Sequence, residues 1–226
     1  MNFEHSIFSY CSMRNVSFQN CSFINCQFEY CDFKDSCFIN CDLRYSKFVS
    51  TYVDIDILNS SPREHNLKLK FARNLRVNFD SLGLEKYKRK AQKMELEAQR
   101  EFLYKCWSSE DSYYDKKYSS IQKTYKFLEW IKFKLNDWIW GHGESIKKCI
   151  ISTLLFLLLI SLYITLSSST KFYETTIYVI AYFIGSIDNN SLPNYFSLCT
   201  KSIIIILRII SSGLLLSILI QNLSKR

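Results

Sequence analysis

Cysteine and histidine are the residues of this sequence with the most direct chemistry, because both bind metals and both act as nucleophiles or acid–base groups. Within residues 1–60, five cysteines are separated by multiples of five residues: Cys11, Cys21, Cys26, Cys31 and Cys41. The three histidines, His5, His65 and His142, are far apart and lack the spacing of metal ligands. The sequence also has no Walker loop, no nucleophile elbow and no HExxH motif. We therefore expect no enzyme activity, no metal site and no cofactor.

A second candidate for chemistry is a glycine-containing turn near the C-terminus. It follows a short apolar segment, 172–184, and precedes a long apolar block, 202–223. At membrane depth, irregular backbone is tolerated only against protein or water, and carbonyls at such turns line ion paths. This layout predicts that the turn lines a pore mouth. The residues concerned are Ile184, Gly185, Ser186, Ile187 and Asp188.

Two residues inside the last apolar block are unusual for a segment in lipid. Arg208 is costly there, and such a residue generally faces a bundle interior, a partner or water. The alternative is a side chain that snorkels to the membrane boundary. Gly213 lies near the middle of the block, where a small residue permits close helix packing or a bend. We predict a role in gating or helix packing for both residues.

The elements that must position these residues begin with an N-terminal repeat of period five. Large apolar residues occupy every fifth position: Phe3, Phe8, Met13, Phe18, Phe23, Phe28, Phe33, Phe38, Leu43, Phe48, Val53 and Leu58. The position two residues before each is small or β-branched from Ser6 to Thr51. Neither the helical nor the strand period gives this pattern. It fits a square coil in which about four repeats make a turn and turns stack ~4.8 Å apart as short parallel strands.

In such a coil, residues twenty apart stack on the same side, so Cys11 lies over Cys31 and Cys21 over Cys41. Two thiols on a side cannot form a four-ligand zinc site. The stacking distance would allow a disulfide, but a reducing compartment argues against one. We therefore predict that these cysteines are small apolar fillers of the inward position. Cys37 lies outside the pattern and is expected to point outward.

Residues 1–60 resemble the pentapeptide-repeat family. The runs Cys21-Ser22-Phe23-Ile24-Asn25 and Cys41-Asp42-Leu43-Arg44-Tyr45 match its pattern of a small residue, a variable residue or Asp/Asn, Leu or Phe, and two polar residues. The resemblance implies a right-handed quadrilateral β-helix. Some members of the family mimic DNA and bind topoisomerases, but about three weakly acidic turns are too short for that role.

Residues 61–146 are expected to form a charged helical linker. Residues 85–106 are rich in helix formers, and a second candidate helix covers 109–136. This segment holds the basic excess behind the net charge of +8, next to the first long apolar block. That position suits anionic lipid head groups. Nucleic acid is a weaker candidate because acidic residues are interspersed, and a solvated face is the plainest interpretation.

Residues 147–226 are expected to form a membrane domain with two spans. A span needs ~20 apolar residues, and residues 149–170 and 202–223 supply them. The apolar segment 172–184 is too short to cross and is predicted to be a re-entrant helix. No cleavable signal peptide is visible at the start of the sequence. Both termini should therefore be cytosolic, since basic residues flank the outer ends of the blocks: Lys147, Lys148, Lys225 and Arg226.

The run DWIWGHGES (137–145), just before the first span, strengthens a resemblance over the whole chain. It is similar to the motif W-x-x-G-Y-G-E that precedes the channel domain in bacterial pentapeptide-repeat proteins with a C-terminal two-span ion-channel domain. The matching positions are Trp138, Gly141, His142, Gly143 and Glu144. The resemblance implies a multi-pass protein of the bacterial inner membrane.

Potassium-type channels of two spans carry Thr-Thr-Ile-Gly-Tyr-Gly-Asp at the pore turn. Aligned with that motif, Ile184, Gly185 and Asp188 match, whereas both threonines, the tyrosine and the second glycine are replaced. A β-branched isoleucine, Ile187, stands at the second glycine position, where it resists a positive φ. The alignment implies passage of potassium or another monovalent cation, with selectivity left open.

These patterns together predict an oligomeric, ion-channel-like membrane protein. Two spans per chain cannot enclose a pore, so a homotetramer is the expected assembly. The cytosolic repeat domain would serve assembly, regulation or the binding of a protein partner. The alternative is a non-conducting, membrane-anchored scaffold that presents the β-helix to a partner. A third interpretation is a pore that depolarises the host cell on a trigger.

Overall fold

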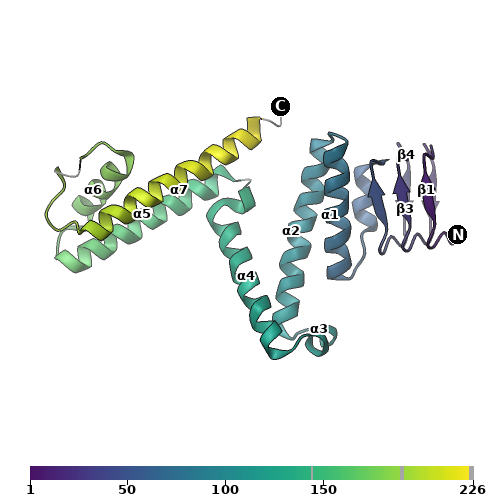
Figure 1. Cartoon of the computed structure of the whole chain (residues 1–226), viewed down its shortest axis with the longest axis horizontal. Coiled ribbons are helices and arrows are strands. Elements are labelled where there is room, and N and C mark those ends of the chain that lie inside the picture. Colours follow the sequence, from purple (N-terminus) through teal and green to yellow (C-terminus); the bar gives the residue numbers. More distant parts are fainter. Residues whose placement is uncertain (144, 189–190, 224–226) are drawn as a thin grey trace. The chain divides into compact units, whose positions relative to one another are not determined.

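The computed structural model describes residues 1–143, 145–188 and 191–223. Glu144 of the expected pre-span motif and the basic residues Lys225 and Arg226 lie outside these ranges. The chain forms two compact units, Met1–Trp130 and Ile131–Arg226. The first holds the repeats and the helices that follow them, and the second holds the apolar helices (Figure 1). Each unit is described by itself below.

The repeats form a β-helix-like coil of short parallel strands. The strands are β1 (Ile7–Ser9), β2 (Ser17–Gln19), β3 (Gln27–Glu29), β4 (Asp32–Phe33), β5 (Cys37–Ile39), β6 (Lys47–Val49) and β7 (Tyr52–Val53). They pair β1-β3-β6, β2-β5 and β4-β7, each time with a partner twenty residues away, such as Phe8 with Phe28. Single bridges such as Asn2 with Ser22 add a further side. The predicted stacking of residues twenty apart is therefore confirmed, in strands of only two or three residues.

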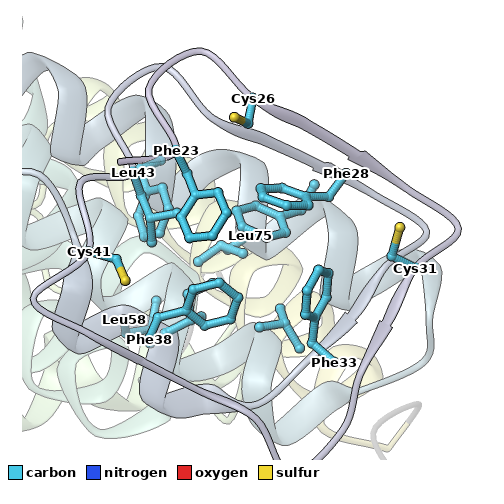
Figure 2. Packing of buried hydrophobic residues seen from close by; sticks show 14 of the residues in the cluster. Phe23, Cys26, Phe28, Cys31, Phe33, Phe38, Cys41, Leu43, Leu58 and Leu75 are labelled. Carbon is cyan, nitrogen blue, oxygen red and sulfur yellow. The ribbon is translucent and has the colours of Figure 1, made fainter. Parts of the chain in front are cut away.

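Phenylalanine ladders fill the interior of the coil. The rings of Phe8, Phe28 and Phe48 stack with centroids 5.2 and 4.9 Å apart. Figure 2 shows the rings of Phe23, Phe28, Phe33 and Phe38 pointing toward one another across the coil, with the cysteines close to the backbone. Each aromatic pair adds about 0.5–1.5 kcal/mol beyond the area that it buries. The large residue of each repeat is thus the source of the coil's core.

Four of the five repeat cysteines are buried, as the sequence predicts, whereas Cys11 is half-buried. Cys21, Cys26, Cys31 and Cys41 are buried, and the Cys41 thiol donates to the carbonyl oxygen of Phe18 at 3.3 Å. Burial raises the pKa of the Cys41 thiol, which keeps it protonated and unreactive. All nine cysteines are free, and Cys37 contacts the Ser17 hydroxyl on the outside of the coil.

The corners of the coil have left-handed backbone at every fifth residue. These positions are His5, Tyr10, Asn15, Asn20, Asn25, Tyr30, Asp35, Asn40, Tyr45 and Ser50, with φ between 46° and 62°. Asparagine and aspartate tolerate this region better than other non-glycine residues, and they hold half of the corners. The polar pair at the end of each repeat therefore contains the residue that turns the chain.

A short 3-10 helix, η1 (Ile55–Ser60), and helix α1 (His65–Ser81) close the C-terminal end of the coil. The side-chain amide of Asn78 accepts from Thr51 N–H at 2.9 Å and donates to Thr51 C=O at 2.8 Å. Asn74 makes the same pair of bonds with Phe48, at 2.8 and 3.1 Å. The two amides imitate the backbone of a further strand. They satisfy groups that the last turn would otherwise leave without partners.

The sequence predicts α2 (Glu85–Ser108) well but misses α1. The two helices pack side by side (Figure 1), and the nearly buried Glu95 accepts from Arg73 and Arg76 at 2.8 and 2.7 Å. The single helix predicted over 109–136 is wrong. It is two helices, α3 (Ser112–Lys117) and α4 (Ser120–Trp140), because Tyr118 has extended backbone.

The second unit contains the apolar helices α5 (Ile146–Ser168), α6 (Phe172–Ile184) and α7 (Leu198–Leu223). Helices α5 and α7 are long and apolar enough to cross a membrane, and only 28% and 17% of their most apolar windows are buried within the chain. A helix in the core of a soluble protein would be covered on most of its surface. Their exposed isoleucine and leucine side chains suit contact with lipid.

Candidate functional site

The predicted pore-lining residues begin with Ile184, the last residue of α6, and this helix packs against both long helices of its own chain. The buried side of α6 carries Thr175, Val179 and Tyr182, spaced by four and three residues. Val179 and Tyr182 belong to one apolar cluster with Leu157 and Ile164 of α5 and Ile204 of α7, in which Leu192 and Phe196 of the following loop also take part. The hydroxyl of Thr175 lies 3.0 Å from that of Thr170, which joins the start of α6 to the end of α5.

Gly185 ends α6 through a Schellman motif. Its φ is 88°, its N–H donates to Tyr182 C=O at 3.1 Å, and the Ser186 N–H donates to Ala181 C=O at 2.9 Å. This 6→1 and 5→2 pattern requires left-handed backbone at Gly185, which a side chain would strain. Gly185 is therefore needed to turn the chain, whether or not ions pass the turn.

The structure brings Gly185 and Arg208 together. A Cβ atom added at Gly185 would lie 3.1 Å from Nη1 of Arg208, so the guanidinium packs directly against the turn. The C-terminal end of a helix carries a partial negative charge, and a cation there gains about 0.3–1 kcal/mol. The half-buried Arg208 is thus placed at the end of α6. Sequence reasoning singles out both residues without pairing them.

The other residues of the turn have different environments. Ile184 is the last residue of α6 and is 68% exposed, so the alignment with potassium-type channels begins in helical backbone. Ser186 and Asp188 are exposed, whereas Ile187 packs against the apolar cluster. Ser186 and Asp188 are therefore the polar side chains that the turn presents outward.

Gly213 lies within the uninterrupted helix α7. An added Cβ would meet nothing within 4 Å, so Gly213 makes no close helix contact with the described parts of its own chain and α7 has no break there. The neighbouring hydroxyls of Ser211 and Ser212 donate to carbonyls of α7, those of Arg208 and Ile209. A packing role for Gly213 would need a second copy of the chain and stays a prediction.

The pre-span motif forms a tight elbow between α4 and α5 (Figure 1). Gly141, His142 and Gly143 have φ of 59°, 54° and 88°. A Cβ on Gly141 would come within 3.0 Å of Cβ of Ser145, which caps α5 by accepting from Lys148 N–H. The motif thus has a local structural reason, namely an abrupt change of direction before the first apolar helix.

Several side-chain contacts fix this elbow. The ring of His142 lies 4.4 Å from that of Phe133, and Trp138 packs edge-on against Phe156 of α5. Lys148 donates to the Asp137 carboxylate at 2.7 Å, and this hydrogen bond lowers the pKa of Asp137. The contacts that hold the elbow therefore include Phe133 and Lys148, which lie outside the run 137–145, and Asp137, which begins it.

No cluster of metal-binding side chains occurs in the part of the chain that the structure describes. The N-terminal segment, residues 3–47, matches a family model described as Pentapeptide repeats (9 copies). Searches of curated proteins and of solved structures gave no match. The N-terminal segment thus consists of pentapeptide repeats, followed by a helical part with two helices that could span a membrane.

Proposed function

We propose that the protein is an oligomeric, channel-like membrane protein in which a cytosolic pentapeptide-repeat coil serves assembly, regulation or partner binding. The observation that carries the proposal is the arrangement of α6. A helix too short to cross a bilayer packs against two helices that are long enough, and it ends in an irregular turn with outward-facing polar side chains. Irregular backbone inside a bilayer must be surrounded by protein or water, and water at the turn would require an aqueous path into the membrane.

The proposal includes finer assignments. The coil is a right-handed, four-sided β-helix, supported by pairings twenty residues apart on four successive sides. The protein lies in a bacterial inner membrane with both termini cytoplasmic, supported by the basic residues outside the spans. A homotetramer supplies the enclosure that two spans cannot provide, and monovalent cations pass Ser186 and Asp188. Nucleic acid is not a partner in this account.

A non-conducting, membrane-anchored scaffold is the second candidate, and two observations favour it. Residues 3–47 match pentapeptide repeats, which suggest protein interaction. In addition, the cationic Arg208 packs against the turn, where it opposes the approach of cations. A scaffold would use the rigid coil as its working surface and the long helices as an anchor.

Ion flux in liposomes that contain the purified full-length protein separates the two candidates. A channel predicts flux that Gly185→Trp abolishes, since the new side chain would both strain the turn and displace Arg208. Tyr163→Trp is the matched control, because it introduces the same side chain at an aromatic position of α5 that is 64% exposed. Replacement of the permeant ion then determines selectivity. A well-folded oligomer without flux would refute the channel and leave the scaffold.

A further inference from the structure

Helix α4 has two sides with opposite surroundings. On one side, Trp130 packs against Trp107 of α2 at 5.4 Å, and Phe133 is buried under the ring of His142. The other side is apolar and mostly uncovered, although Trp138 at its end also packs against Phe156 of α5. We call it the α4 apolar face, and its residues are Ile121 (72% exposed), Tyr125 (65%), Leu128 (55%), Leu135 (49%) and Trp138 (46%).

The residues of the α4 apolar face are spaced by four, three, seven and three, which places them on one side of the helix. A helix of this length extends for ~30 Å. A contiguous apolar stripe of that size on a protein surface marks an interaction site. Lys132 stands within the stripe, four residues after Leu128 and three before Leu135, and is exposed. Whatever covers this face must therefore accept both apolar side chains and a central positive charge.

Continuity of the chain points to a lipid surface as the occupant. Only residues 141–145 separate the end of α4 from α5, the first helix apolar enough to enter a bilayer. Trp138 and Trp140 stand at that end of α4, and tryptophan concentrates at membrane–water interfaces. Four lysines and two acidic residues prevent α4 itself from crossing the bilayer: Lys123, Lys126, Lys132, Lys134, Glu129 and Asp137.

Charge complementarity makes the lipid anionic. Four lysines stand against two acidic residues on α4, and Lys132 lies within the apolar face itself, whereas Lys123 and Lys126 pair with Asp115 and Glu129. Lysine stems can lie along apolar surface while the ammonium groups reach phosphates. A second copy of α4 is a poorer occupant, because pairing two apolar faces would remove Lys132 from water without an opposite charge on the stripe.

We propose that α4 lies in the plane of an anionic membrane surface, with the α4 apolar face in the head-group and acyl boundary and Lys132 on lipid phosphates. This inference rests on the membrane location within the proposed function and not on conduction. Helices of this kind bind through buried apolar area together with attraction to anionic lipid. The helix would thus fix the height of the elbow relative to the bilayer.

The test places a tryptophan on each side of α4 in the full-length protein. Leu128→Trp lies on the α4 apolar face, and Glu129→Trp is the matched control because one residue turns a helix by ~100°. Both variants are reconstituted into vesicles of phosphatidylcholine with phosphatidylglycerol, in which lipids carry bromine on the upper acyl carbons. The measured quantity is the quenching of the added tryptophan, taken as the difference from the unsubstituted protein.

We expect quenching at position 128 to be about twofold or more stronger than at 129, and to weaken when the anionic lipid is omitted. Replacement of Lys132 by glutamine should reduce the dependence on anionic lipid, with helix content unchanged by circular dichroism. Equal or absent quenching at both positions would overturn the inference. Crosslinking between the α4 helices of two chains, in the absence of quenching, would also overturn it, because a second copy would then cover the face.

Extraction of the protein by alkaline carbonate would refute the membrane location, and with it this inference. A retained protein without quenching refutes the inference alone.

Discussion

Replacing Asn78 with alanine tests whether α1 stabilises the open end of the coil by imitating a strand. Asn78 is 2% exposed and its partner Thr51 is fully buried, so water cannot replace the lost bonds. The change leaves the N–H and C=O of Thr51 without partners. A buried polar group that loses its partner costs about 1–3 kcal/mol. Two backbone groups lose their partners, and the cost is partly offset because the amide of Asn78 is no longer buried. The expected loss in the free energy of local unfolding is about 2–4 kcal/mol.

Hydrogen–deuterium exchange of the full-length protein measures this loss within the coil alone. A tenfold change corresponds to about 1.4 kcal/mol, so amides of the last turn should exchange about 30- to 1,000-fold faster. Asn74→Ala should have a smaller effect, because Asn74 is half-buried and water can take the place of its amide. Asn59→Ala is the control, since Asn59 is exposed. Equal exchange in the Asn78 and Asn59 variants would refute the capping role of α1.

Three further predictions follow from the turn, the elbow and the thiols. Gly185→Ala should destabilise the α6 turn by about 1–2 kcal/mol, whereas Gly213→Ala should be neutral or stabilising by up to ~1 kcal/mol, as measured by exchange or thermal unfolding. The pKa of Asp137 in the folded protein lies below its ordinary value of 3.8, so the bond to Lys148 stabilises the elbow fully above pH 3.8 and is lost as the pH falls through the lowered pKa. Protease cleavage at the elbow should therefore increase at low pH in the parent protein. In Asp137→Asn, cleavage should not change with pH. Maleimide should modify Cys37 before Cys31 and Cys41, whose pKa values are raised by burial, and mass spectrometry of timed samples would contradict this if all three reacted together.

The elements with strong local periodicity could be predicted from the sequence. The repeat of period five fixes which residues point inward, and it predicts that Phe8 stacks on Phe28. The short helix over 172–184 and the two long apolar helices are likewise specified by local runs of apolar residues. Each of these elements depends on neighbours in the sequence, which is why patterns within the chain suffice to find them.

What escaped prediction depends on contacts between distant segments. Helix α1 has apolar residues at Leu67, Phe71, Leu75 and Phe79, but its function depends on Asn74 and Asn78, whose partners lie in the coil. A pair of asparagines four residues apart beside an apolar stripe is the signal that could have revealed the cap. The break at Tyr118 has no comparable signal, since no glycine or proline marks it.

The contact between Gly185 and Arg208 could not be predicted for a similar reason. Helix periodicity identifies the elements that carry the two residues, but it does not set how far α7 slides along α6. That register follows from side-chain packing in the cluster around Tyr182 and Ile204. Sequence reasoning therefore found the unusual residues of the site and missed the geometry that joins them.

The most direct test of the central claim is whether a reagent placed at the turn stops ion movement. Ser186→Cys introduces a thiol at an exposed position beside Gly185 without altering the left-handed residue. The protein as it stands, with its exposed Cys199, is the control for modification elsewhere. The account predicts liposome flux that a charged methanethiosulfonate reagent blocks in Ser186→Cys and leaves unchanged in the parent. Flux that persists after complete modification of the introduced thiol would contradict passage of ions at this turn.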